Sequence, residues 1–260
     1  MLTIVYEDSA LLVVSKPAGL STQAPPIAGP TLEQAVRAYL NPGNPAAAYA
    51  GTLHRLDRPV SGLVAWAKTP AAARHVSRQF QQRRVHKLYW ALVEGRPHAG
   101  PQIWDDWLVR DPTGLGRAQT CAPGTPRAQP ARTFVQILAP VAGFTWLALR
   151  PETGRTHQLR IQAASRGLPI LGDSLYGATT PFAPNAIALH ARELAFLHPD
   201  DGRPLRFQAP VSSPWPSLPD ADPPIPDLDP ILGRLSDHLL NTLAPPRPPS
   251  GNPNLLDPEP

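Results

Sequence analysis

The sequence predicts an α+β fold. A mixed, mostly antiparallel sheet should form the core, with a few flanking helices and a disordered, proline-rich C-terminal tail. Three observations predict this fold. In the first 211 residues, apolar or alternating runs of strand length recur, whereas only three segments carry helix start and stop signals. Strands and helices do not alternate regularly, as they would in a doubly wound parallel sheet. Of the 36 prolines, 14 follow residue 211.

The first forty residues predict two strands and a helix. An interrupted apolar stretch over residues 4–14 indicates two short strands, which lead into a Lys-Pro-Ala-Gly turn at 16–19. Thr31 and Gln34 have the spacing of a capping box, in which each side chain accepts a hydrogen bond from the backbone N–H of the other residue. A helix is therefore expected from Thr31 to Leu40.

The next segment predicts a loop, a strand and a helix. A proline at 59 and a glycine at 62 disfavour helix, so residues 54–61 should form a loop that leads into an apolar strand at 63–67. A Thr-Pro pair at 69–70 supplies an N-cap followed by proline in the first helical position. The helix that it starts is expected over residues 71–83.

The rest of the folded region is dominated by strands. Residues 86–94 alternate, with Tyr89 on one face and Trp90 on the other, which predicts a strand covered on both faces. A helix is expected over 156–166, capped by Thr156 and stopped by Gly167. Further strands are expected at 103–109, 132–138, 144–150, 187–197 and 205–208, the last two joined by an Asp-Gly turn.

Charge and proline content divide the chain into a body, residues 1–211, and a tail, residues 212–260. The body holds 22 Lys and Arg against 13 Asp and Glu, and the tail holds 2 against 7. The tail should be extended and largely disordered, with one short helix at 231–243, because its prolines remove backbone donors. A body charge of +9 suits a phosphate-rich partner, although a solvated arginine-rich surface would also account for it. The acidic tail either folds back over the basic surface or, more simply, aids solubility.

Several classes of protein are disfavoured by composition. Cys121 is the single cysteine, so no internal disulfide can form and a secreted scaffold is not expected. The N-terminus is acidic where a signal peptide would be basic, and no apolar run approaches the roughly 18 residues of a membrane helix. Neither metal-ligand spacing nor a nucleotide-binding glycine motif is present. We therefore expect a cytoplasmic, soluble monomer without membrane contact.

One motif carries the strongest functional signal. The segment His54-Arg55-Leu56-Asp57, followed by Ser61-Gly62 and an apolar strand that ends in Ala67-Lys68, resembles the signature of the RluA-like RNA pseudouridine synthases. That family has Thr where this chain has Val60, which removes a hydroxyl but leaves Asp57 in register.

Five further blocks support the resemblance, in the order that the family has them, over roughly residues 4–210. Any one block could arise by chance, whereas six in order are highly specific. The blocks are Lys16-Pro-Ala-Gly19, Lys87-Leu-Tyr89 continuing to Gly95, Thr153-Gly-Arg-Thr-His-Gln-Leu-Arg160, Gly172-Asp173-Ser-Leu-Tyr-Gly177, and the closing segments Leu189-His-Ala191 and Leu197-His-Pro199.

The resemblance implies that residues 1–211 are a pseudouridine synthase catalytic domain and that Asp57 is its nucleophile. The reaction breaks a C–N glycosidic bond, turns the base and joins C5 to the same sugar carbon, so no cofactor or metal is expected. The enzyme must extrude the base from its stack, and a carboxylate serves as nucleophile if it is kept ionised. A neighbouring guanidinium favours the ionised form. By itself, an aspartate in this loop would as readily cap a turn.

The guanidinium is expected from the helix at 156–166. The resemblance assigns Arg160 as the ion-pair partner of Asp57 and Arg155 to contacts with RNA or the active site, although the two arginines could exchange roles. Arg160 lies three residues after His157 on the same helical face. Arg155 lies near the helix N-terminus, where backbone N–H groups favour phosphate. A surface role for either arginine remains the alternative.

Four other residues receive roles from the resemblance. Tyr89 would present its ring to the extruded uracil and its hydroxyl for proton handling, although a tyrosine within a strand is more often core. Leu159 would form an apolar floor under the base, or belong to the ordinary helix core. Arg55 would fill the vacated base stack or hold a phosphate. His54 is expected to be a structural hydrogen-bonding residue.

Three functions follow from these observations. The first is isomerisation of uridine to pseudouridine in structured RNA, either transfer RNA or ribosomal RNA, by attack of Asp57 on the sugar or the base. The second is a catalytically inactive RNA-binding or ribosome-assembly protein on the same scaffold, and the third a hydrolase with an aspartate nucleophile. The third leaves the basic body unexplained. Target choice should reside in loops such as residues 112–131.

Overall fold

The computed structural model describes residues 2–23, 29–111 and 117–216, which belong to a compact unit, Met1–Ser217. Most of the predicted tail, including its expected helix at 231–243, lies outside the described residues. The strands are β1 (Thr3–Glu7), β2 (Leu11–Lys16), β3 (Gly51–Thr52), β4 (Ser61–Ala67), β5 (His86–Val93), β6 (Gln102–Arg110), β7 (Ala118–Cys121), β8 (Gln129–Val141), β9 (Phe144–Pro151), β10 (Leu189–Leu197) and β11 (Pro204–Gln208). The helices are α1 (Leu32–Leu40), α2 (Pro70–Gln81) and α3 (Gln158–Ala164), with short 3₁₀ turns at Pro45–Ala47 and Ser174–Tyr176.

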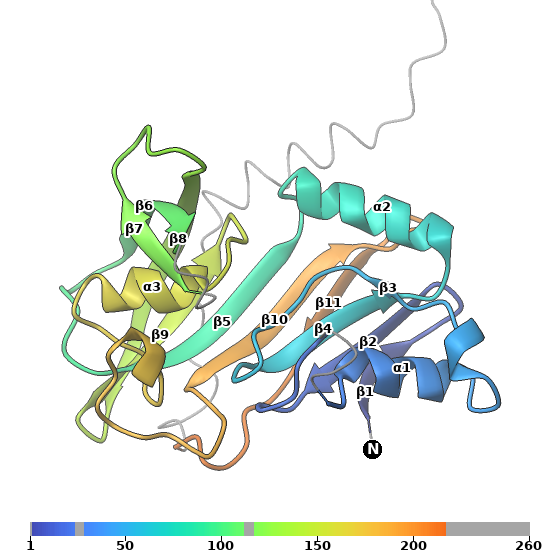
Figure 1. Ribbon diagram of the computed structural model, residues 1–260, viewed down its shortest axis with the longest axis horizontal. Coiled ribbons are helices and arrows are strands. Elements are labelled where there is room, and N and C mark those ends of the chain that lie inside the picture. The colour runs from blue at the N-terminus through green and yellow to red at the C-terminus, as the bar shows by residue number, and fades with distance from the viewer. Residues whose placement is uncertain (1, 24–28, 112–116, 217–260) are drawn as a thin grey trace, which may run out of the picture. The chain divides into compact units, whose positions relative to one another are not determined.

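The described strands form one mixed sheet, in the order β1-β2-β4-β10-β5-β9-β8-β6-β7, with β3 paired to β4 and β11 to β10. All pairings between these strands are antiparallel except that of β4 with β10. This confirms the predicted α+β class with a mostly antiparallel sheet. In Figure 1, β10 crosses the centre of the molecule between β4 and β5.

The parallel contact of β4 with β10 depends on a glycine. Gly62 pairs with Ala191 and has a φ of +113°, a conformation that residues with a side chain rarely adopt. A Cβ atom at Gly62 would lie 2.4 Å from the backbone oxygen of Ala191. Glycine therefore allows the strand that follows the Asp57 loop to approach β10 closely.

The main core lies between α2 and the sheet half formed by β2, β4, β10 and β11. Figure 1 shows α2 lying along this half, and α3 beside the hairpin of β6 and β7. Val76 of α2 is fully buried, and Leu63 and Leu194 of the sheet belong to the same cluster. A smaller cluster under α3 contains Leu108, with Ile161 of α3 packed against it. The apolar faces of the helices thus bind them to opposite ends of the sheet.

The two predicted helices in the first half of the chain start as expected. Thr31 accepts a hydrogen bond from the N–H of Gln34, and the Gln34 side chain accepts one from the N–H of Thr31, so the capping box is present. The Thr69 side chain caps α2 by accepting from the N–H of Ala72.

The third helix corrects the prediction. It begins at Gln158 and ends at Ala164, its N-cap residue is His157 in a left-handed conformation (φ 55°), and Thr156 does not cap it. The reason is the Gln158 side chain, whose oxygen accepts from the N–H of Arg155 and from the Thr153 hydroxyl. These bonds close the loop before the helix, and the left-handed backbone of His157 keeps Thr156 out of the helix.

Two strands and one packing contact were not predicted. Strand β3 has two residues, and β7 lies within residues 112–131, which were expected to be loop. Trp215, in the range predicted as tail, packs against Trp146, Phe182 and His190, with ring centroids 5.3, 5.6 and 6.1 Å away. Packing therefore continues past residue 211.

None of the described helices is long and apolar enough to span a membrane.

Candidate active site

Asp57 lies in the loop between β3 and β4, at the edge of a recess in the protein surface. Its backbone oxygen accepts from the N–H of Val60 in a tight turn. The Thr22 hydroxyl accepts from the N–H of Leu56, at 3.1 Å, and donates to the Leu56 oxygen, at 2.8 Å. The loop is therefore held on both sides of Asp57, whose side chain remains 31% exposed.

A buried lysine also holds this loop. Lys16 is 1% exposed, and its Nζ donates to the backbone oxygens of Pro17, Leu20 and Arg58. Burial lowers the pKa of Lys16 to about 8, against a smaller opposing effect from the charge of Asp57. The ammonium thus joins the turn at 16–20 to the residue after Asp57.

Arg160 is the ion-pair partner of Asp57. Its Nη1 lies 3.1 Å from Asp57 Oδ2, while Nε and Nη2 donate to the two oxygens of Asp173 at 2.7 and 2.8 Å. Burial alone would lower the pKa of Arg160, but the hydrogen bonds and charges of the two carboxylates raise it. Asp173 is 2% exposed. Asp173 therefore orients the charged guanidinium of Arg160, and the remaining nitrogen, Nη1, is directed to Asp57.

His157 forms a second contact at Asp57. Its Nε2 lies 3.7 Å from Asp57 Oδ2, and its Nδ1 is 2.9 Å from the Tyr176 hydroxyl. Burial lowers the pKa of His157, with a smaller opposing effect from the charge of Asp57, and so favours the neutral imidazole. The Tyr176 oxygen also accepts from the N–H of Ala118 in β7, at 3.0 Å. The hairpin of β6 and β7 is thereby connected to the surroundings of Asp57.

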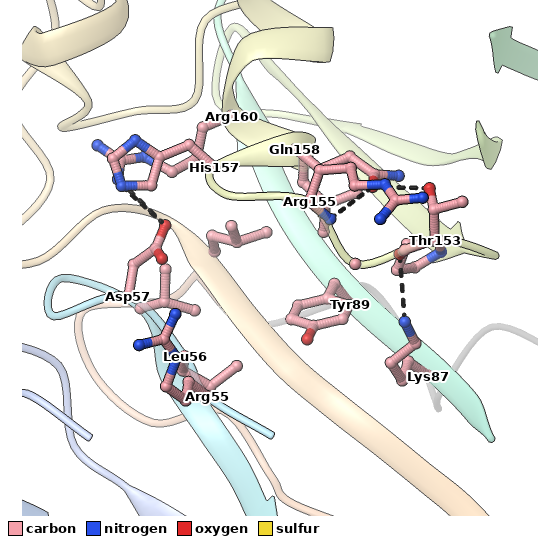
Figure 2. A pocket seen from close by; sticks show the side chains of 15 residues that line it. Arg55, Leu56, Asp57, Lys87, Tyr89, Thr153, Arg155, His157, Gln158 and Arg160 are labelled. Carbon is pink, nitrogen blue, oxygen red and sulfur yellow. Dashed lines mark hydrogen bonds and ion pairs between the residues drawn. The ribbon is translucent and has the colours of Figure 1, made fainter. Parts of the chain in front are cut away.

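Tyr89 and Leu159 give the recess an apolar wall. The recess has a volume of about 120 Å³, and Figure 2 shows the Tyr89 ring between Asp57 on one side and Lys87 on the other. Burial raises the pKa of Tyr89, and the negative charge of Asp57 raises it further, so the phenol remains protonated at neutral pH. Leu159 is 7% exposed.

The recess adjoins a larger groove of about 1050 Å³ with a positively charged lining. Lys87 donates to the Thr153 oxygen at 3.2 Å, and burial lowers its pKa to about 8. Arg155 Nε donates to the Pro130 oxygen at 3.1 Å. The cationic lining residues are Arg55, Arg58, Arg83, Lys87, Arg155 and Arg160, and the carboxylates that line the groove are Asp57 and Glu152.

The structure brings the predicted site residues together. Arg55, Asp57, Tyr89, Arg155, Leu159 and Arg160 all line the recess. Arg155 and Arg160 were the two alternatives for the ion-pair partner of Asp57, and in the structure Arg160 forms this ion pair. The functional roles of these residues remain predictions.

His54 has the structural role that was expected. Its Nε2 accepts from the N–H of Ala65 at 3.1 Å. Burial lowers the pKa of His54 to about 3, with a smaller effect from Lys87, so the ring is neutral and able to accept.

Three contributors to the site were not identified from the sequence. Asp173, His157 and Tyr176 all fall in motif blocks, but the blocks gave no reason to place them around Arg160 and Asp57. One signal was available for His157, because a residue three positions before Arg160 shares its helical face. No periodicity relates Asp173 or Tyr176 to the helix, because both follow it in a separate turn.

The sequence of this chain is similar to those of known proteins. Residues 10–165 match the model of a family described as RNA pseudouridylate synthase. Ribosomal large subunit pseudouridine synthase C of Vibrio cholerae is 32% identical over 216 residues, which cover 81% of this chain and 66% of that protein. Ribosomal large subunit pseudouridine synthase D of Nitrosomonas europaea is 36% identical over 220 residues, covering 81% of this chain and 62% of that protein. The chain thus spans just under two thirds of the length of these curated relatives.

A solved structure is similar over a larger share of both chains. The human RNA pseudouridylate synthase domain containing 1 has a TM-score of 0.68 and 29% identity, and the match covers 91% of this chain and 95% of the other. The family model alone covers more than half of the chain, and it includes both Asp57 and Arg160. The chain therefore belongs to the RNA pseudouridylate synthase family.

Proposed function

We propose that this protein isomerises uridine to pseudouridine in structured RNA, with Asp57 as the nucleophile. One observation carries the proposal: the Asp57 carboxylate, 3.1 Å from the Arg160 guanidinium, lies at the edge of a recess that adjoins a basic groove. The groove attracts the RNA backbone, and the recess receives a base that has left its stack. The buried Arg160 guanidinium holds the Asp57 carboxylate in place at the edge of the recess.

The geometry divides the work between the two oxygens of Asp57. Oδ2 accepts from Arg160 and lies near His157, whereas Oδ1 makes no hydrogen bond within the described part of the chain. Oδ1 is therefore the oxygen available to the substrate. It forms a transient bond to the sugar or to the base, and the glycosidic C–N bond breaks. The uracil then turns, C5 bonds to the same sugar carbon, and the covalent link to Asp57 is released.

Tyr89 and Leu159 hold the uracil while it is detached. The Tyr89 ring packs against the base, and its hydroxyl remains protonated and donates a hydrogen bond during proton transfer. Proton count balances, because the proton lost from C5 is matched by the proton gained at N1 of the base. Arg55 and Arg155, at the rim of the recess, contact the RNA backbone or fill the space that the base has left.

The names of the relatives favour one of the two RNA classes. Several of them act, by name, on the ribosomal large subunit. We therefore favour ribosomal RNA over transfer RNA as the substrate, with the protein acting as a cytoplasmic monomer. Pseudouridine mapping in total RNA from a strain that lacks this gene would identify the uridine.

The nucleophile is tested by Asp57→Asn, with Asp200→Asn as the matched control on an exposed turn. Each protein is incubated with total RNA from the deletion strain, and pseudouridine is detected as a carbodiimide-dependent reverse-transcription stop. We expect product from the wild type and the control and none from Asp57→Asn, with RNA affinity within about twofold of wild type. A normal isomerisation rate in Asp57→Asn would refute the assignment. Absence of product from the wild type, with RNA binding intact, would favour an inactive RNA-binding protein.

A further inference from the structure

A second cleft lies beside the active-site groove, and the proposed reaction does not use it. It has a volume of about 760 Å³. Arg155 and Thr156 line both the cleft and the groove, so the two spaces adjoin along these residues. The other lining residues come from the end of β6, from β7, from the turn that follows it and from the start of β8, among them Val109, Arg110, Gln119, Arg127 and Gln129.

The lining of this cleft is cationic. The lining contains three arginines, Arg110, Arg127 and Arg155, and one carboxylate, that of Asp111. Arg110 and Arg127 are exposed, and among the described residues the Arg110 guanidinium makes one long hydrogen bond, 3.4 Å from Nη2 to the Thr156 hydroxyl. Arg155 is tethered through Nε, which leaves its two terminal nitrogens without a hydrogen bond in the part of the chain that the structure describes. Guanidinium groups in this state bind phosphate oxygens well.

The conformation of Arg127 adds a second observation. Its φ of +65° is unusual for a residue with a side chain. A backbone hydrogen bond from the N–H of Ala128 to the oxygen of Thr125 closes the turn around it. The turn therefore places the guanidinium at the cleft, although a glycine at this position would be less strained.

Two glutamines supply groups of a different kind. Gln119 in β7 and Gln129 at the start of β8 are exposed and line the cleft. A primary amide offers a donor and an acceptor side by side, which matches the edge of a nucleobase. Val109, which pairs with Gln119 across the two strands, provides apolar surface next to them. Base edges are accessible in this way when the RNA is single-stranded.

We propose that this cleft binds a single-stranded RNA segment that flanks the target uridine. This inference rests on the proposed function. Arg110 and Arg127 contact its phosphates, and Gln119 and Gln129 contact its bases. Arg155, shared with the active-site groove, marks the point where the strand turns toward Asp57.

The cleft is also connected to the catalytic residues through the protein. The Tyr176 hydroxyl accepts from the N–H of Ala118, which lines the cleft, and lies 2.9 Å from His157 Nδ1. RNA bound at this point therefore rests on a strand fixed relative to Asp57. Flanking contacts of this kind set which nucleotide reaches the recess.

Binding of labelled oligouridylates tests the inference, with 6- and 16-nucleotide probes and anisotropy measured between 50 and 300 mM KCl. The double variant Arg110→Ala/Arg127→Ala is compared with Arg74→Ala/Arg96→Ala, which removes two arginines that are exposed and line none of the three spaces. We expect the first variant to bind the long probe about tenfold more weakly than wild type, and its salt slope to fall by about 1.4, as for two lost single-strand phosphate contacts. The short probe should be affected less than threefold.

The glutamines are tested separately with Gln119→Ala/Gln129→Ala. This variant should keep the wild-type salt slope while its preference between 16-nucleotide oligouridylate and oligoadenylate changes at least threefold, because amides contact bases and not phosphates. An unchanged preference would overturn base recognition by these two residues.

The outcomes separate this inference from the proposed function. If Arg110→Ala/Arg127→Ala and the control variant bind both probes equally at every salt concentration, the cleft does not bind RNA, whatever the isomerisation assay shows. If the loss of affinity for the long probe is observed but the wild type makes no pseudouridine, RNA binding by the cleft is supported and the proposed reaction is refuted.

Discussion

The role of Asp173 in fixing Arg160 gives a sharp prediction for the variant Asp173→Asn. The carboxylate accepts two hydrogen bonds from Arg160, at 2.7 and 2.8 Å, and both side chains are nearly inaccessible. An asparagine keeps the shape but replaces one acceptor with an NH₂ donor that faces the N–H groups of the guanidinium. One hydrogen bond is lost, two donors oppose each other, and Asp57 becomes the only counter-ion of Arg160 among the described residues.

The magnitude follows from burial. Removing one partner of a buried ion pair costs about 3–5 kcal/mol. Since Asp57 remains as a counter-ion, we expect about 3 kcal/mol of lost stability for Asp173→Asn. The guanidinium loses its fixed orientation, and a displacement of about 1 Å at a reacting group costs roughly 100-fold in rate. Asp173 does not line the recess, so kcat should fall by this factor while KM changes less than about threefold.

The assay is single-site isomerisation measured at 15 °C, with folding checked by circular dichroism and thermal unfolding. Asp106→Asn is the control, because it removes a carboxylate that is 3.0 Å from Arg166, away from the recess. The control should lose stability but keep its kcat within about threefold of wild type. A folded Asp173→Asn enzyme with wild-type kcat would refute the claim that Asp173 positions Arg160.

Two further predictions concern the backbone and the groove. Gly62→Ala would place a Cβ atom 2.4 Å from the Ala191 oxygen at a φ of +113°. It should therefore lower the free energy of unfolding by more than about 3 kcal/mol, which thermal unfolding would detect. A decrease in Tm of less than about 2 °C would contradict this prediction. Lys87 has a pKa of about 8 and is therefore charged below pH 8 and neutral above it. Wild-type RNA affinity should fall about two- to fivefold from pH 7 to pH 9. Lys87→Met should bind RNA more weakly at pH 7 and lose most of this pH dependence. If the pH profiles of the two proteins are parallel, Lys87 does not contribute to RNA binding.

Much of the site was predictable because its residues fall in motif blocks that resemble those of a known family. Asp57 and Arg160 were expected to meet, and they lie 3.1 Å apart. The position of Asp173 was not predictable from spacing, because it follows α3 in a turn whose path depends on packing. Its burial beside an arginine becomes visible only when the sheet brings these segments together.

Whether a predicted element agrees with the structure depends in the same way on whether neighbours in sequence determine it. The capping box at Thr31 involves neighbours in sequence, so local chemistry determines it and the prediction was correct. The start of α3 is set instead by Gln158, which also donates to the Thr133 hydroxyl and thereby ties the loop to β8. Strand β7 has a short, polar sequence with little strand propensity, and it forms because β6 offers a partner edge.

The order of the strands has a consequence for synthesis of the protein. β4 and β5 are consecutive long strands, yet they do not pair with each other, because β10 lies between them. The part of the sheet on one side of β10 contains β4 and the Asp57 loop. The part on the other side contains β5 with Tyr89 and β9, which leads to the segment with Arg160. A nascent chain that has not yet emerged past residue 197 therefore has two half-sheets and no strand to join them. The proposed isomerisation should therefore require a chain that extends through β10, and a truncation before Leu189 should form no pseudouridine.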